Sequence, residues 1–201
     1  MVSRLETELK VRLEGAAAYQ RVCRRLGPPA DEWDQENHYY RSADGSIPGK
    51  SGVIRMRAEK GRVLFTVKLD GTLQEGLARA MEFELPWKGE GRGWPPPPES
   101  LWEVGHPGMD ALAARRGGRL PLVWIGQMTN RRKTFRFSES LLLEVDASRY
   151  PDGCTDYELE LETPDPDRDR ALVSRRLEEA GIPYIPQVET KYQRFLRHLA
   201  T

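Results

Sequence analysis

Hydrophobic and polar residues alternate along much of this chain with a period of two. In residues 5–13, leucines, a valine and Thr7 fall on one side, and the other side carries Glu6, Glu8, Lys10 and Arg12. Successive side chains of a β-strand point to opposite faces, so this pattern predicts a strand with one apolar and one charged face. An isolated strand of this kind would be an ordinary half-buried strand with a solvated face.

The same alternation recurs along the chain, and this recurrence changes the interpretation. Further strands are predicted at residues 35–41, 53–58, 64–69, 80–85, 130–137, 141–146 and 157–162, with a short apolar strand at 120–125. Their charged faces carry Arg55, Arg57, Lys68, Glu82, Glu84, Arg132, Glu144, Asp146, Glu158 and Glu160. The chain therefore repeats one type of strand while the sign of the charge varies between strands.

Helical spacing of apolar residues predicts helices at residues 16–26, 169–180 and 189–197, and short helical pieces between 102 and 117. Residues 86–98 are rich in glycine and proline and include four consecutive prolines, which excludes a regular strand or helix. We interpret residues 86–98 as exposed. Residues 86–126 form an insertion or helical connection between strands of a single domain that spans residues 1–201.

Composition excludes several classes of protein. The 201 residues include 31 Lys and Arg and 31 Asp and Glu, so the net charge is zero, which argues against a protein that coats nucleic acid. No apolar run approaches the roughly 20 residues that span a membrane, and the N-terminus has no apolar export signal. The two cysteines, Cys23 and Cys154, form no CxxC motif, so we expect reduced thiols that act as packing residues in a cytoplasmic protein.

About eight amphipathic strands can form an open sheet with one wet face, or a closed barrel wide enough for one small ligand. An open sheet leaves its edges unprotected, which favours closure. We therefore predict an α+β fold with a closed eight-stranded antiparallel barrel, a charged lumen and flanking helices. Unpaired buried charge is costly, so the lumen must be wet and its charges must pair with each other or with bound ions. Carboxylates for a divalent metal beside Arg and Lys for phosphate are typical of metal-dependent phosphoryl chemistry.

The charged strands and the last predicted helix also contain recognisable motifs. These are Glu6-x-Glu8-x-Lys10, Gln35-Glu36-Asn37-x-Tyr39-Tyr40, Arg55-x-Arg57, Phe65-Thr66-Val67-Lys68, Leu143-Glu144-Val145-Asp146, Tyr157-Glu158-Leu159-Glu160 and Thr190-Lys191-Tyr192. In this order, from about residue 5 to residue 196, they resemble the signature of the CYTH family, also called triphosphate tunnel metalloenzymes. Within the family, the chain looks most like the plant-type inorganic tripolyphosphatases. It differs at Arg41, where an acidic residue is usual, and in its proline-rich insertion.

The resemblance implies a tunnel that acts on triphosphates with Mg²⁺ or Mn²⁺. By position, the residues that would bind the phosphate chain are Lys10, Arg55, Arg57, Lys68, Arg132 and Lys191. The metal ligands would be Glu6, Glu8, Glu144, Asp146, Glu158 and Glu160. Glu6 and Glu158, with Lys10, would take the catalytic roles and orient the attacking water. Glu82 and Glu84 would belong to the substrate-binding set.

The implied function is metal-dependent hydrolysis of inorganic tripolyphosphate to pyrophosphate and phosphate. Alternatives with the same phosphate-binding residues are a thiamine triphosphatase, a nucleoside triphosphatase and a class IV-type adenylate cyclase. A non-catalytic polyphosphate-binding module is a further alternative, although a pure binder needs cations far more than carboxylates. The expected partner is a small-molecule triphosphate, with no nucleic acid or membrane partner, and the protein is expected to be a monomer or homodimer.

Overall fold

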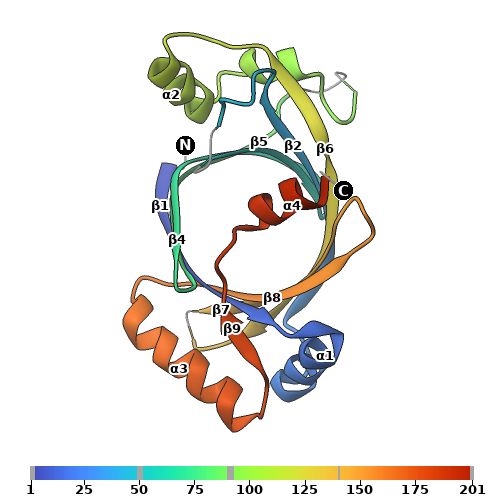
Figure 1. Ribbon diagram of the computed structural model, residues 1–201, viewed down its shortest axis with the longest axis vertical. Helices are drawn as coiled ribbons and strands as arrows, with labels where there is room; N and C mark the ends of the chain where they lie inside the picture. The colour runs from blue at the N-terminus through green and yellow to red at the C-terminus, as the bar shows by residue number, and fades with distance from the viewer. Residues whose placement is uncertain (1–2, 49–51, 90–92, 140, 200–201) are drawn as a thin grey trace. The chain divides into compact units, whose positions relative to one another are not determined.

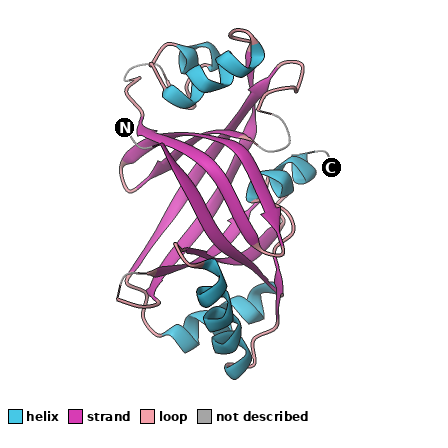
Figure 2. Ribbon diagram, turned by 90° about the vertical axis from the view of Figure 1, so that its left-hand side faces the viewer, coloured by secondary structure: helices cyan, strands magenta, loops and turns pink. Residues whose placement is uncertain are grey.

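The computed structural model describes residues 3–48, 52–89, 93–139 and 141–199. Its strands are β1 (Ser3–Leu13), β2 (Asp31–Ser42), β3 (Val53–Glu59), β4 (Arg62–Gln74), β5 (Leu77–Pro86), β6 (Leu122–Arg136), β7 (Leu142–Arg149), β8 (Thr155–Glu162) and β9 (Tyr184–Pro186). Its helices are α1 (Gly15–Leu26), the 3-10 helix η1 (Pro98–Trp102), α2 (Pro107–Arg116), α3 (Pro166–Glu179) and α4 (Lys191–Leu199). Figure 2 shows that the strands are long and strongly twisted.

The strands form one sheet in the order β5-β4-β3-β2-β6-β7-β8-β1-β9, and β5 also pairs with β1. This last pairing closes eight strands into an antiparallel barrel, and β9 is an extra strand beside β1. The predicted α+β fold with a closed eight-stranded barrel is therefore confirmed. Closure removes the exposed edges that an open sheet would leave.

The prediction of two separate strands at 120–125 and 130–137 is wrong. The chain runs through both segments as the single strand β6 of 15 residues. Gly126 lies between the two predicted segments. Its φ of 130° is a conformation that favours glycine, and the strand continues through it. The short strand β9 was not predicted.

The chain divides into two compact units. Unit 1 comprises Met1–Leu5, Gln35–Gly71 and Ala80–Met128, and unit 2 comprises Glu6–Asp34, Thr72–Arg79 and Thr129–Thr201. In unit 1, η1 and α2 pack their apolar residues against the apolar faces of β2, β3 and β4. The buried residues of this core include Leu101, Met109 and Leu112 from the helices and Ile54, Met56, Phe65 and Val67 from the strands. The segment between β5 and β6 is therefore part of the core, although Trp94 is exposed as predicted.

In unit 2, α1 and α3 cover the apolar face of β1, β7 and β8. Val22 of α1 and Leu177 of α3 are buried against strand residues that include Leu9, Leu143 and Leu159. Helix α4 lies on the opposite side of β8 from α1 and α3 (Figure 1). Because strand side chains alternate, the charged residues of β1, β7 and β8 point to the side on which α4 lies.

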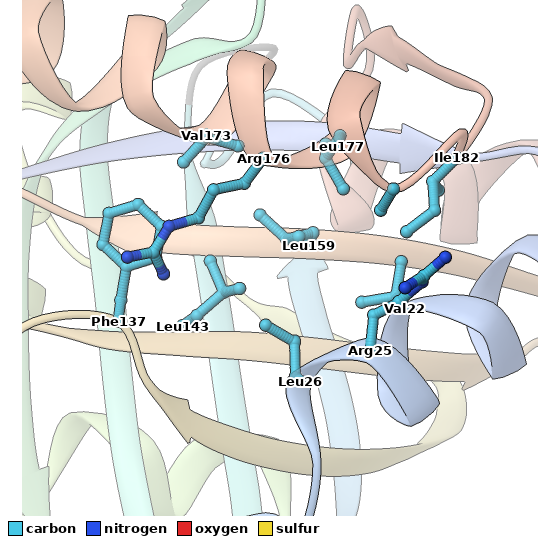
Figure 3. Close-up of a pocket in the computed structure, with 11 residues that line it drawn as sticks. Val22, Arg25, Leu26, Phe137, Leu143, Leu159, Val173, Arg176, Leu177 and Ile182 are labelled. Carbon is cyan, nitrogen blue, oxygen red and sulfur yellow. The ribbon is translucent and has the colours of Figure 1, made fainter.

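A small cavity lies in this apolar core, between α1, α3 and the strands (Figure 3). Its volume is about 40 Å³, and Val22, Leu159 and Leu177 are among its lining residues. Arg176 also lines the cavity, and its guanidinium lies 4.5 Å from the centre of the Phe137 ring. Pockets that bind small molecules usually exceed about 300 Å³, so this cavity is a packing gap of the core.

We expect Leu159→Ala to lower the free energy of unfolding by about 2–5 kcal/mol, because it removes a buried side chain beside an existing gap. Leu159 is 1% exposed and lies between β1 and β7, opposite Val11 and Val145. Urea denaturation measures the change. Leu142→Ala, on the neighbouring strand, is the control, because Leu142 is 49% exposed and should change stability little. Equal losses for both variants would contradict the assigned core.

Candidate active site

The strand register of unit 2 places carboxylates of neighbouring strands opposite one another. Glu144 of β7 pairs with Glu160 of β8, and Asp146 pairs with Glu158. On the other side of β8, Lys10 of β1 pairs with Glu160. Like charges at directly opposite positions repel each other, so this arrangement requires cations between the carboxylates.

Three of the predicted phosphate-binding cations lie among these carboxylates. Lys10 Nζ is 2.5 Å from Glu160 Oε1 and 2.5 Å from Glu8 Oε2. Arg132 of β6 donates from Nη2 to Asp146 Oδ2 and to Glu160 Oε2, each at 2.7 Å, and its Nη1 also contacts the Glu144 carboxylate. The third cation, at the start of α4, is Lys191. Its Nζ lies 2.6 Å from Asp146 Oδ2 and 2.9 Å from Glu158 Oε1.

Asp146, Glu158 and Glu160 form a compact group that we call the carboxylate trio. Each offers an oxygen within 4.8 Å of the other two, and their residues are only 0%, 1% and 4% exposed. Three oxygen donors at this spacing suit a hard divalent cation such as Mg²⁺ or Mn²⁺. The donor set of the trio therefore fits the metal that the sequence predicts.

The charge network holds these groups in their ionised forms. Burial opposes ionisation of Asp146 and Glu160, but neighbouring cations outweigh it: the pKa of Asp146 falls to about 2, and that of Glu160 falls well below its ordinary value. Burial also opposes the charge on Lys10 and Lys191, but the surrounding carboxylates raise the pKa of both lysines. The pKa of Glu144 shifts in the opposite direction from those of Asp146 and Glu160. Burial and the nearby Glu160 carboxylate raise it to about 7, although Arg132 lowers it.

Arg194 is one of the most buried side chains of unit 2, and it was not predicted as a site residue. It is 2% exposed, and its Nη2 donates to Glu158 Oε2 at 2.7 Å. Its Nε lies 2.6 Å from Asp156 Oδ2 and 2.9 Å from the Tyr150 hydroxyl. Lys191 and Arg194 stand three residues apart on α4, a spacing that places both side chains on one helix face. This spacing from the predicted site residue Lys191 is the sequence feature that could have identified Arg194.

The ion pairs described above connect four cations to six carboxylates in one network within unit 2, and these ten groups carry a formal charge of −2 when all are ionised. The cations are Lys10, Arg132, Lys191 and Arg194, and the carboxylates are Glu8, Glu144, Asp146, Asp156, Glu158 and Glu160. Glu6, a further predicted metal ligand, is 7% exposed and lies on the same strand face two residues before Glu8. The structure therefore collects the predicted acidic residues of unit 2 around three predicted phosphate-binding cations.

Unit 1 contains a second group of predicted site residues. Lys68 Nζ lies 3.3 Å from Glu82 Oε1, and Arg4 donates to Glu82 Oε2 at 3.1 Å. Burial opposes ionisation of Glu82, but Lys68, Arg55 and Arg4 outweigh it and lower the pKa of Glu82 to about 2. Glu84 accepts a hydrogen bond from the Thr66 hydroxyl at 2.8 Å and lies 3.6 Å from Arg55 Nη2.

Arg55 and Arg57 project from neighbouring positions of the same face of β3. Arg57 donates from Nε to Asn37 Oδ1 at 3.1 Å, which orients its guanidinium. Arg55 is 8% exposed and donates from Nη2 to Thr66, whereas its buried Nε has no hydrogen-bond partner among the described residues. A buried donor without an acceptor is costly, so Arg55 is suited to an incoming anion.

Comparisons with known proteins agree with this fold. The family model named CYTH domain matches residues 4–196. The structure of HpAC1 from Hippeastrum, described as having a dominant triphosphatase activity, is 26% identical, covers 96% of this chain and 95% of its own, and gives a TM-score of 0.85. A candidate adenylate cyclase from Bacillus halodurans is also 26% identical, covers 97% of this chain and 99% of its own, and gives a TM-score of 0.70.

More distant solved structures and the curated proteins add less. A protein from Pyrococcus horikoshii, 12% identical, covers 94% of this chain and 98% of its own with a TM-score of 0.60, which shows the fold alone. No curated protein matches the chain. No helix of the described residues is long and apolar enough to cross a membrane. With its family model matched over almost its entire length, the chain belongs to the CYTH domain family.

Proposed function

We propose that this protein hydrolyses inorganic tripolyphosphate to pyrophosphate and phosphate with Mg²⁺ or Mn²⁺. The observation that carries the proposal is the buried carboxylate trio, with Lys10, Arg132 and Lys191 in direct contact with it. Oxygen ligands for a divalent cation and fixed cations for phosphate are the two requirements of phosphoryl transfer. Family membership and the activity described for HpAC1 add support.

In this proposal, Asp146, Glu158 and Glu160 hold the metal, with Glu8, Glu6 and Glu144 completing the acidic set. When bound, the metal polarises the phosphoryl group and offsets the negative charge that opposes attack by water. Lys10, Arg132 and Lys191 bind phosphate oxygens and counter the charge that shifts in the transition state. Glu158 and Glu6 accept hydrogen bonds from the attacking water and thereby orient it.

The cations of unit 1 are proposed to bind phosphate groups. Arg55 and Arg57 offer planar guanidinium groups that match phosphate oxygens, while Lys68 acts as a point charge. Glu82 and Glu84 hold Lys68 and Arg55 in place through the contacts described above. Held side chains lose little conformational freedom when an anion arrives, which favours tight binding.

The second candidate function is hydrolysis of an organic triphosphate, either a nucleotide or thiamine triphosphate. It uses the same groups, because all these substrates share the triphosphate. Cyclisation of ATP, in which the ribose hydroxyl replaces water, is a weaker candidate, since a triphosphatase activity is described as dominant in HpAC1 despite its cyclase name. A non-catalytic polyphosphate binder would have little use for a buried carboxylate trio.

Phosphate release from tripolyphosphate, ATP and thiamine triphosphate tests the proposal. The purified protein is assayed with each substrate at equal concentration, with Mg²⁺, with Mn²⁺ and with EDTA. We expect release from tripolyphosphate to be fastest and to stop in EDTA. Faster release from ATP or thiamine triphosphate would select the second candidate. Tight binding of tripolyphosphate without any release would select the binding module.

We expect Arg55→Ala to raise the KM for tripolyphosphate by about tenfold or more, because one charge-assisted hydrogen-bonding group contributes about 1.5–3 kcal/mol. Steady-state kinetics at saturating metal measures the change. Arg62→Ala is the matched control, since Arg62 is on the adjacent strand β4, its side chain is 62% exposed and it pairs with Glu59. A similar KM for wild type and Arg55→Ala would remove Arg55 from the substrate-binding set.

A further inference from the structure

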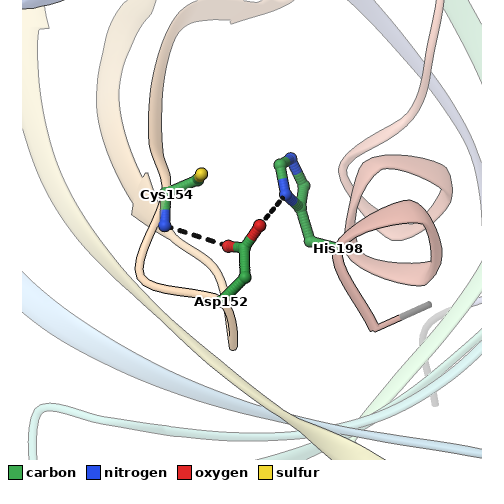
Figure 4. Close-up of side chains that lie close together, drawn as sticks. All are labelled: Asp152, Cys154 and His198. Atoms are coloured by element: carbon green, nitrogen blue, oxygen red, sulfur yellow. Dashed lines mark hydrogen bonds and ion pairs between the residues drawn. The ribbon is translucent and has the colours of Figure 1, made fainter. Parts of the chain in front are cut away.

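A second group of possible metal ligands lies in unit 2, outside the carboxylate trio. Asp152 and Cys154 come from the loop between β7 and β8, and His198 comes from the last turn of α4. Each offers a ligand atom, and these atoms lie within 4.8 Å of one another (Figure 4). We call these three residues the loop–helix triad. Cys154 is exposed, so the prediction that it is a packing residue is wrong, whereas Cys23 is half-buried against the core.

The loop holds the first two members of the triad side by side. The backbone of Tyr150 bonds to that of Cys154 at 2.9 Å and to that of Gly153 at 3.0 Å, which closes a tight turn. Gly153 has a φ of 85°, a conformation that favours glycine. The Cys154 N–H donates to Asp152 Oδ1 at 2.9 Å. The turn therefore places Asp152 and Cys154 side by side, and the hydrogen bond orients the Asp152 carboxylate.

The imidazole of His198 is also oriented. Its ring stacks on Tyr150, with centroids 4.4 Å apart and planes 15° apart. Its Nδ1 lies 2.6 Å from Asp152 Oδ2. Figure 4 shows this ring nitrogen of His198 directed at the Asp152 carboxylate. A metal ligand held in this way needs little reorganisation when an ion binds.

The donor types distinguish this triad from the carboxylate trio. A thiolate, an imidazole and one carboxylate are typical ligands of Zn²⁺, whereas Mg²⁺ takes oxygen ligands. Ligand atoms around a tetrahedral Zn²⁺ lie about 3–4 Å apart, given metal–ligand distances of about 2.0–2.3 Å. The three ligand atoms lie within 4.8 Å of one another, and the hydrogen-bonded pair of His198 Nδ1 and Asp152 Oδ2, at 2.6 Å, has to separate slightly to admit an ion. Because it lies at the surface, water can supply the fourth ligand.

We propose that Asp152, Cys154 and His198 bind Zn²⁺ or a similar borderline transition-metal ion, separately from the metal of the proposed function. The ion would join the β7–β8 loop to the end of α4. Helix α4 also carries Lys191 and Arg194, and the Tyr150 hydroxyl accepts a hydrogen bond from Arg194. The ion therefore stabilises the position of the helix that supplies two cations to the carboxylates.

Cobalt substitution tests the proposal on the full chain. The protein is titrated with Co²⁺ in saturating Mg²⁺, which occupies the hard oxygen ligands, and the near-ultraviolet thiolate-to-cobalt charge-transfer band is recorded. We expect a band that saturates at one equivalent and disappears when Zn²⁺ is added. Cys154→Ser should abolish the band. Cys23→Ser is the matched control, and both Cys23→Ser and Glu160→Gln should retain it.

Zn²⁺ affinity provides the second measurement. His198→Gln should weaken Zn²⁺ binding by at least about tenfold in competition with a chromophoric chelator, since even loss of a residue that only supports a ligand typically costs 10–100-fold. Zn²⁺ should also raise the Tm of the wild type but not that of Cys154→Ser. The absence of a band, a band that depends on Cys23, or an unchanged affinity in His198→Gln would each overturn the proposal. None of these readouts depends on triphosphate hydrolysis.

Discussion

Replacing Glu160 with glutamine is expected to reduce metal-dependent triphosphate hydrolysis by about 1,000-fold. Glu160 contacts Lys10 at 2.5 Å and Arg132 at 2.7 Å, and it is a member of the carboxylate trio. Glutamine keeps the size of the side chain but removes its charge, so the trio loses a metal ligand. Charge stabilisation by a bound metal is worth several kcal/mol, and about 4 kcal/mol corresponds to this factor in rate.

The kcat at saturating Mg²⁺ or Mn²⁺ measures this effect, and circular dichroism checks that the variant is folded. Glu179→Gln is the control, because Glu179 lies at the end of α3 with its side chain 69% exposed. It should keep the wild-type rate. A Glu160→Gln variant that hydrolyses tripolyphosphate at nearly the normal rate would remove Glu160 from the metal-binding role.

Replacing Arg194 with glutamine is expected to lower the free energy of unfolding by about 3–5 kcal/mol, because the carboxylates of Glu158 and Asp156 each lose a charged partner of a buried network. The guanidinium is 2% exposed and contacts Glu158 at 2.7 Å and Asp156 at 2.6 Å. We also expect slower hydrolysis, since Glu158 would lose one of the contacts that fix its orientation. Chemical denaturation and steady-state kinetics measure the two effects.

Arg197→Gln is the matched control on the same helix. Its guanidinium is 58% exposed and pairs with Glu189 at 3.1 Å. Exposed ion pairs contribute about 0–1 kcal/mol, so this variant should be nearly as stable as the wild type. Comparable destabilisation by the two substitutions would show that general loss of charge on α4, and not the buried contacts of Arg194, accounts for the effect.

Most strands and the charge of each strand face could be predicted from local pattern. Glu158 and Glu160 stand two residues apart, which places them on one strand face whatever the rest of the chain does. The same holds for Glu6 and Glu8, so the acidic residues of each strand lie on one face of that strand. The continuation of β6 through Gly126 was missed, because a glycine with a positive φ ends some strands and lies within others.

The alternation of apolar and polar residues does not predict which distant segments of the chain contact each other. In the sequence, Arg194 is one of several charged residues of a predicted helix. Only the docking of α4 against β8 buries it beside Glu158. The loop–helix triad joins Asp152 and Cys154 to His198, more than 40 positions later. No period or motif connects these residues, so their proximity follows from packing alone.

The sequence by itself determined the amphipathic strands, the sign of the charge on each strand face and the family signature, because side-chain direction in a strand depends only on position parity. The tertiary structure decided which carboxylates share a cation, which arginine is buried and which loop meets the end of α4. Those features depend on strand register and helix docking, which bring together residues that the linear order keeps apart.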